Sequence, residues 1–120
     1  GSATAQENMF GQAKVQLTDS CWVNASAGSS SDTLEETMAN LKGYLTYKDA
    51  QLYESTYNGA PCIVLMYDTD KNYTADASIA IYVFAPGNKK VEISAVKING
   101  KLSDMLQDQD LLAVIGSVTW

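Results

Sequence analysis

Polar and apolar residues alternate near the start of the chain. Val15 and Leu17 are apolar, and the residues on either side of each are polar. A period of two is typical of a strand that buries one face. Residues 13–25, AKVQLTDSCWVNA, are therefore predicted to form a half-buried strand.

After a loop of small residues, the apolar spacing becomes that of a helix. Asp32, with Glu35 three residues later, predicts a capping box at the helix start. Apolar side chains then recur at helical intervals: Leu34, Met38, Leu41 and Leu45. We expect an amphipathic helix over 33–45 whose apolar side packs on the core.

Four stretches after this helix have strand character. Residues 51–57 are followed by an Asn-Gly pair, which tolerates positive φ and is typical of a tight hairpin. Residues 60–68 and 78–85 are apolar at consecutive positions, which predicts strands covered on both faces. Residues 89–98 follow a Pro-Gly-Asn turn and place their apolar residues on one face.

Together these elements predict an α+β fold. Consecutive strands joined by short turns pair antiparallel, which gives a meander sheet of about four to five strands. The helix in the N-terminal half is expected to pack on this sheet. Residues 101–116 predict a short C-terminal helical segment, either one broken helix or two short ones, ending at Gly116.

The chain has enough apolar residues for one core. Its 120 residues are 46% apolar, which suits one domain but not two. Residues 10–120 are predicted to form that single α+β domain. Residues 1–9 are expected to be a tether, and the leading Gly1-Ser2 is typical of a cloning remnant.

A helix followed by a strand meander is similar to the layout of cystatins. This resemblance concerns the fold and covers the helix and the meander. The inhibitor motif of that family, Gln-x-Val-x-Gly, would belong in the first hairpin of the meander, where this chain has TYNGAP. The resemblance therefore implies an arrangement of elements and carries no protease inhibition.

The charge of the chain argues against two classes of partner. Its net charge of -6 repels the phosphate backbone of nucleic acids and anionic membrane surfaces. No apolar run approaches the roughly 18 residues that span a bilayer. We therefore expect neither a nucleic-acid partner nor a membrane-spanning segment.

Two missing residue types exclude much of enzyme chemistry. All 8 basic residues are lysines, and the chain has no histidine. Without histidine there is no Ser-His or Cys-His pair and no histidine zinc site. Without arginine there is no planar fork to grip a carboxylate or phosphate. We expect no cofactor and favour a domain that is not an enzyme.

The loop after residue 67 contains the candidate metal ligands. They alternate along the chain: Asp68, Asp70, Asn72 and Asp76. An EF-hand calcium loop starting at Asp68 fails at its glycine position, which is Tyr73, and at its last ligand position, which is Ile79. A looser calcium cage is the alternative to a solvated connection between strands, and we favour the connection.

The acidic residues also allow an enzymatic alternative. Asp68 and Asp70 would act as an acid-base pair of the kind that glycosidases use. The later aspartates, Asp104, Asp108 and Asp110, are expected to cap helix starts, where carboxylates accept backbone hydrogen bonds.

Tyrosines are the candidate ligand-binding residues: Tyr44, Tyr47, Tyr53 and Tyr57. Tyr53 and Tyr57 have the same parity along one strand and are expected to share a face. Such a patch suits a sugar or a peptide, because tyrosine has a flat apolar body and a polar tip. A packed sheet face with hydroxyls at its rim is the alternative.

Two cysteines, Cys21 and Cys62, bear on the cellular compartment. They are expected to lie close in space, and a disulfide would close a loop of roughly 40 residues and stabilise the fold by about 4 kcal/mol. Two buried thiols are the alternative. The low charge density and the abundant Ser, Thr, Asn and Tyr favour an extracellular or cell-envelope location, with the cytoplasm as the alternative.

The leading hypothesis from sequence is a small exported module that is not an enzyme and that binds a protein or a carbohydrate. The alternative is a small carboxylate-based enzyme or ligand carrier, with or without calcium. A deep pocket with converging carboxylates would favour the enzyme, and a shallow surface with exposed tyrosines would favour the binding module.

Overall fold

The computed structural model describes residues 4–7, 12–29, 31–47, 49–70 and 75–119. Its elements, in chain order, are β1 (Thr4–Glu7), β2 (Gln12–Thr18), β3 (Cys21–Ser29), α1 (Leu34–Leu41), the 3-10 helix η1 (Lys42–Thr46), β4 (Gln51–Tyr57), β5 (Ala60–Asp70), β6 (Ala75–Ala85), β7 (Lys89–Lys97), α2 (Leu102–Leu106) and α3 (Gln109–Ile115). None of these helices is long and apolar enough to cross a membrane.

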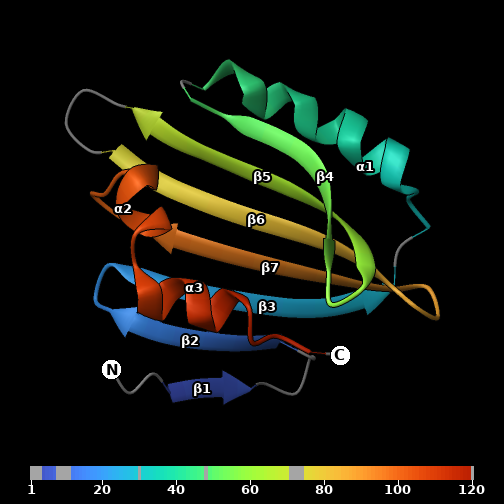
Figure 1. The fold of residues 1–120 in the computed structure, drawn as a ribbon, viewed down its shortest axis with the longest axis horizontal. Coiled ribbons are helices and arrows are strands. Elements are labelled where there is room, and N and C mark those ends of the chain that lie inside the picture. Colours follow the sequence, from blue (N-terminus) through green and yellow to red (C-terminus); the bar gives the residue numbers. More distant parts are fainter. Residues whose placement is uncertain (1–3, 8–11, 30, 48, 71–74, 120) are drawn as a thin grey trace.

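The strands form one antiparallel sheet in the order β1-β2-β3-β7-β6-β5-β4 (Figure 1). Strands β4 to β7 are neighbours in chain order, so the predicted meander is confirmed. β3 lies beside β7, at the end of the meander farthest from β4. The chain therefore crosses from β3 to the opposite edge of the sheet, and α1 lies in this crossover.

The predicted count of four to five strands is too low. Six strands, β2 to β7, have seven residues or more, and the four-residue β1 pairs with β2 at the edge. The extra strands come from the N-terminal part, including Thr4–Glu7 in the stretch expected to be a tether. The sheet also continues beyond the meander, which sequence spacing did not reveal.

The stretch 13–25 is a hairpin of two strands, where one strand was predicted. β2 and β3 meet at a turn formed by Asp19 and Ser20, where the Thr18 Oγ1 accepts a hydrogen bond from the Ser20 backbone N–H at 3.2 Å. Short polar side chains stabilise such turns by bonding to nearby backbone groups. Apolar side chains occupy odd positions both before and after the turn, so one continuous strand was predicted, and only the polar run at 18–20 marks the turn in the sequence.

The Asn-Gly hairpin between β4 and β5 is confirmed. Asn58 has φ 48° and Gly59 has φ 81°, the pair of positive values that a type I′ turn requires. This turn matches the right-handed twist of paired strands. β4 and β5 accordingly stay in register along all of β4.

The predicted helix over 33–45 consists of α1 followed by η1. Its capping box is one residue later than predicted. The Thr33 Oγ1 accepts from the Glu36 backbone N–H at 3.1 Å, and the Glu36 carboxylate accepts from the Thr33 N–H at 3.2 Å. The pairs Asp32/Glu35 and Thr33/Glu36 have the same spacing, so the sequence pattern alone could not tell which pair forms the capping box.

Most of the apolar side of this helix faces the sheet. Leu41 is buried, and Leu34 and Met38 pack beside it. Leu45 is 48% exposed, which corrects its place among the predicted core residues. It lies in η1, where three residues per turn replace 3.6, so the helical spacing no longer directs it to the core.

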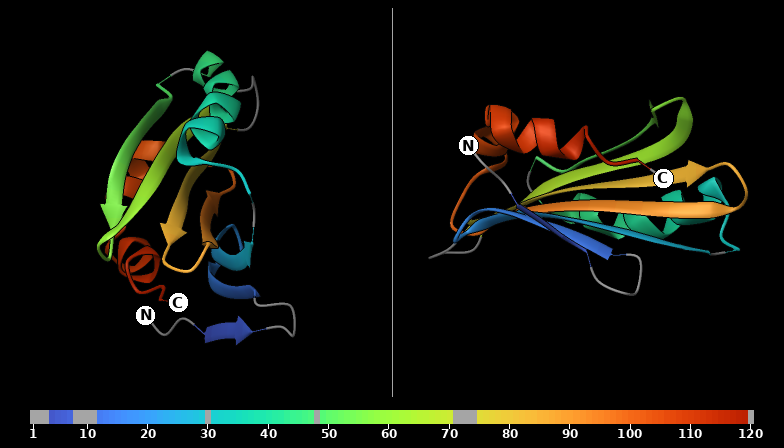
Figure 2. Two further views of the ribbon diagram at one scale, coloured as in Figure 1. Left: turned by 90° about the vertical axis from the view of Figure 1, so that its right-hand side faces the viewer. Right: turned by 90° about the horizontal axis from the view of Figure 1, so that it is seen from below.

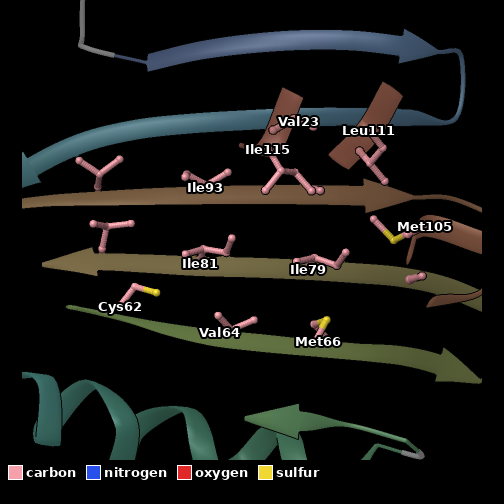
Figure 3. Packing of buried hydrophobic residues seen from close by; sticks show 14 of the residues in the cluster. Val23, Cys62, Val64, Met66, Ile79, Ile81, Ile93, Met105, Leu111 and Ile115 are labelled. Atoms are coloured by element: carbon pink, nitrogen blue, oxygen red, sulfur yellow. The ribbon is translucent and has the colours of Figure 1, made fainter. Parts of the chain in front are cut away.

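Helices cover the sheet on both sides (Figure 2). α2 and α3 lie on one side, here called the α3 face, and α1 lies on the other, the α1 face. The larger core is on the α3 face, where Ile81 and Ile93 meet Leu111 and Ile115 (Figure 3). The smaller core lies under α1 and consists of Leu41, Ile63, Leu65 and Ala80.

The C-terminal segment forms two short helices, one of the two predicted arrangements. Asp108 is the N-cap of α3, and its Oδ1 accepts from the Leu111 N–H at 3.1 Å; Gly116 is the C-cap. The Asp104 carboxylate accepts from the Lys101 N–H at 3.2 Å at the start of α2. Asp104 and Asp108 therefore cap helix starts, as predicted.

The two cysteines do not form a disulfide. Both are buried free thiols on the α3 face. Cys21 is on β3 and Cys62 is on β5, with β7 and β6 between them. Three strand spacings amount to about 14 Å, twice the Cα separation that a disulfide tolerates. The expectation that Cys21 and Cys62 lie close together was wrong, because it placed β3 near β5. A disulfide therefore no longer supports export.

We predict that replacing Leu41 with Ala lowers the free energy of unfolding by about 2 to 4 kcal/mol, because it leaves a cavity in the smaller core. Leu45→Ala is the matched control, with an expected loss below about 0.5 kcal/mol, because that side chain is exposed. Urea unfolding followed by circular dichroism measures both. Equal losses in the two variants would contradict this assignment of the core.

Candidate functional site

The predicted ligand-binding tyrosines lie on opposite faces of the sheet. Tyr53 and Tyr57 share a face, as predicted, and it is the α3 face, because they pair with Val64 and Ala60 of the larger core. Tyr44 and Tyr47 come from η1 and its end and lie on the α1 face. The four residues therefore do not form one site.

Tyr57 has a structural role on the α3 face. Its hydroxyl donates to the Ile115 carbonyl oxygen at 2.6 Å and accepts from the Val118 backbone N–H at 3.1 Å. Burial raises the pKa of this hydroxyl, which keeps it protonated as a donor. Tyr57 thus joins the end of α3 to β4, whereas Tyr53 is 42% exposed.

Two of the predicted metal ligands, Asp68 and Asp76, accept hydrogen bonds from backbone N–H groups. The Asp68 Oδ1 accepts from the Leu102 N–H at 2.6 Å, at the start of α2, and the Asp76 Oδ1 accepts from the Asn99 N–H at 3.2 Å. The side chain of Asp70 and all of Asn72 lie outside the described residues. Within the described part of the chain, no group of three or more Asp, Glu, Cys or His side chains could hold a metal ion.

We predict that calcium does not stabilise the 68–76 loop, because its sequence departs from an EF-hand at Tyr73 and Ile79. Thermal unfolding in millimolar calcium should overlay that in a chelator. An ion that binds only the folded state at 100 times its Kd would add about 2.7 kcal/mol, which is several degrees in a domain of this size. A shift of several degrees would contradict the prediction.

The α1 face is only partly covered, and its uncovered part is the strongest candidate site. Strand register gives the side chains that stand there. From β3 and β7 they are Trp22, Asn24, Ser26, Glu92, Ser94 and Val96, and from the adjoining part of β6 it is Ser78. We call these seven residues the open surface.

Four tyrosines border the open surface along the side of α1. Tyr67 packs against Tyr44 and Tyr47, with ring centroids 5.2 and 5.0 Å apart, and Tyr82 follows on β6. Tyr67 is paired with Ser78 across the strands and hydrogen-bonds to it. We call Tyr44, Tyr47, Tyr67 and Tyr82 the tyrosine wall. Two of the predicted tyrosines therefore border the candidate site.

Trp22 stands on the opposite side of the open surface. The register places Tyr67, Ser78, Val96 and Trp22 in one row across the strands. Three strand spacings separate the two aromatic residues by about 14 Å. The Lys14 ammonium group lies 5.1 Å from the centroid of the Trp22 ring, so the indole also holds a cation beside the surface.

Two adjacent hollows mark this part of the molecule. One has a volume of about 400 Å³ and lies between the start of α1 and the sheet, with Asp32 and Thr37 on one side and Tyr82, Phe84 and Lys90 on the other. The second has a volume of about 360 Å³ and is lined by Asn24, Ala25, Ser26, Glu92 and Ser94. Ser26 and Glu92 line both, so the two hollows adjoin each other.

Polar chemistry in the hollows centres on Glu92. The Tyr82 hydroxyl donates a hydrogen bond to the Glu92 carboxylate from the neighbouring strand. Burial raises the pKa of Tyr82 well above its usual value, and the negative charge of Glu92 raises it further. The Lys90 ammonium group lies 4.3 Å from the centroid of the Phe84 ring, which keeps a positive charge near the rim.

Three polar side chains of the second hollow have no hydrogen-bond partner within the described chain. They are Asn24, Ser26 and Ser94, and none of them takes part in a side-chain hydrogen bond of the described residues. Asn24 is exposed, and the two serines are partly buried. An amide and two hydroxyls offer both donors and acceptors to a molecule that settles there.

Sequence reasoning missed this surface for a specific reason. In 89–98 it followed the apolar positions Val91 and Ile93, which mark the buried face, and treated the other parity as solvated. The same alternation, followed on its polar side, gives Glu92 and Ser94, and β3 gives Trp22 and Asn24. The missing information was that β3 lies beside β7.

Comparison of the chain with protein-family models, curated proteins and solved structures found no match.

The protonation of Tyr82 predicts a loss of stability in alkali. Because its pKa is higher in the folded state than in the unfolded chain, the stability that this difference contributes is complete below about pH 10 and is lost as pH rises toward the folded pKa. Tyr82→Phe should therefore flatten the decline in unfolding free energy above pH 10. Urea unfolding at pH 9, 10 and 11 measures it, with Tyr53→Phe as control. Parallel declines in all three proteins would contradict the assignment.

Proposed function

We propose that this domain is an exported binding module, not an enzyme, and that its ligand lies on the open surface. The observation that supports this most directly is the pair of adjoining hollows beside α1: Tyr82 and Phe84 line the larger one, and Asn24, Ser26, Glu92 and Ser94 line the second. Binding sites commonly combine a concave shape, aromatic walls and a few convergent polar groups.

The exposed apolar side chains on the α3 face, among the residues that the structure describes, are not combined with such hollows. Tyr53, Leu106 and Leu112 are exposed on the side of the C-terminal helices, and scattered apolar side chains of this kind are normal on proteins. On the open surface, by contrast, Trp22 and the tyrosine wall flank groups that can form hydrogen bonds. A ligand there would gain apolar contact and directional bonds together.

The larger hollow has one feature of the enzymatic alternative, a pair of carboxylates, but their surroundings do not suit catalysis. Asp32 and Glu92 both line the larger hollow, together with Tyr82. A hydrolase that uses two carboxyl groups needs one of them shielded from water so that it stays protonated near neutral pH. Both carboxylate side chains here are exposed, and Glu92 already accepts the Tyr82 hydroxyl. These features support binding over catalysis.

Export is proposed on composition: 18% of the residues are charged, and many side chains carry a hydroxyl or an amide group. The two free thiols are compatible with either compartment, since both are buried.

Amide chemical-shift mapping tests the location of the site. A mixed panel of small polar molecules, containing sugars, nucleosides and short peptides, is added to the ¹⁵N-labelled protein. The expected shifts gather at Trp22, Asn24 and Ser26 of β3 and at 92–96 of β7. Shifts that gather around Tyr53 and α3, or no shifts from the whole panel, would overturn the proposal.

Catalysis is tested in the same samples. We expect no turnover of any panel member by the unaltered protein, by Glu92→Gln or by Asp32→Asn. Turnover that Glu92→Gln and Asp32→Asn both abolish would replace the binding module with the carboxylate enzyme.

A further inference from the structure

We propose that the ligand of the open surface is a neutral oligosaccharide. This inference rests on the proposed function and adds the chemical class of the ligand. Three properties of the open surface support a neutral oligosaccharide: its charge, the kind of hydrogen-bonding groups it offers, and its position within the sheet.

Charge excludes polyanions and favours a neutral molecule. The chain carries -6 and has no arginine, so it repels phosphate or sulfate polymers and lacks a planar fork to hold them. The local charges are mixed: Lys14 and Lys90 lie near the rim, and Asp32 and Glu92 line the larger hollow. A surface with balanced charge attracts neither a strong cation nor a strong anion.

The hydrogen-bonding groups match a polyhydroxyl compound. A sugar hydroxyl donates and accepts at once, so its site needs both kinds of partner close together. Asn24 supplies an amide that does both, Ser26 and Ser94 supply hydroxyls that do both, and Glu92 supplies an acceptor. The described structure gives no internal partner to the first three, so they can bond to a ligand without breaking a bond within the protein.

The aromatic residues supply the apolar part of the recognition. Trp22 stands at one side of the row and Tyr67 at the other, with the small Ser78 and the half-buried Val96 between them. Side chains stand roughly perpendicular to a sheet. The C–H face of a sugar ring therefore has an aromatic side chain to pack against on either side of a low floor.

The position within the sheet argues against an extended peptide. β3 and β7 each have a strand on both sides, so their backbone N–H and C=O groups are paired. A peptide that adds as an extra strand needs an unpaired edge, and the open surface lies away from both edges. On the open surface only side chains can bond to a ligand, because the backbone groups are already paired. This suits a sugar better than an extended peptide.

The test uses the whole domain and a panel of neutral oligosaccharides: cellohexaose, maltohexaose, mannohexaose and tetra-N-acetylchitotetraose, with a heparin hexasaccharide as the anionic comparison. Isothermal titration and ¹⁵N chemical shifts are measured for each. We expect at least one neutral member to bind and to shift Trp22, Asn24 and Ser94, and we expect the heparin fragment not to bind.

Three variants assign the contacts. Trp22→Ala should weaken binding about tenfold or more through lost packing, and Asn24→Ala, at an exposed position that does not threaten folding, should weaken it about tenfold through lost hydrogen bonds. Tyr53→Ala is the matched control, an exposed tyrosine on the opposite face, and should bind as the unaltered protein does.

Each outcome separates this inference from the function on which it rests. No binding by any neutral oligosaccharide, with nucleosides or peptides still shifting the open surface, would overturn the carbohydrate class and keep the site. Oligosaccharide binding that shifts other residues, or that Tyr53→Ala weakens and Asn24→Ala does not, would overturn both.

Discussion

The helical segment on the α1 face is much narrower than the sheet that it packs on. This difference in width leaves part of the α1 face in contact with water. α1 and η1 together extend about 22 Å, and a helix with its side chains is about 10 Å wide. Seven strands spaced about 4.8 Å apart extend about 29 Å across the sheet. α1 therefore shields β5 and part of β6, where the α1 face carries Ile63, Leu65 and Ala80. On β7 and β3, which α1 does not cover, the same face is open to water and carries the polar residues Glu92, Ser94 and Asn24.

The features that sequence could predict are those decided by neighbours along the chain. The Asn58-Gly59 turn sets its own backbone geometry and brings β4 onto β5 without help from elsewhere. Consecutive apolar residues in β5 likewise indicate burial on both sides, and Cys62 through Met66 are all buried. The C-terminal helices were recognisable from their capping aspartates, because a cap is a contact over three residues.

What could not be predicted depends on strand order. Parity shows that Cys21 and Val23 share a buried face, yet it does not say which strand lies next to β3. The pairing of β3 with β7 separates the two cysteines and assembles the open surface, and both consequences concern residues about 70 positions apart, such as Trp22 and Val96. The tyrosine site was divided for the same reason. Tyr44 and Tyr53 are near in sequence, but the chain passes round the edge of the sheet between them.

The contact between Tyr57 and the end of α3 affects how a ligand would bind to the opposite face of the sheet. It bears on the rate of binding and on the conformational entropy that binding costs. It joins residues 61 positions apart and fixes the last helix across the α3 face, from β2 and β3 to the edge strand β4. A sheet held at both sides in this way has little freedom to change its twist, so the rows on its other face keep their spacing in the absence of a ligand. A molecule that binds there meets groups already in place and loses only its own freedom and that of a few side chains. A ligand of the kind proposed above should therefore bind the open surface without a preceding conformational step.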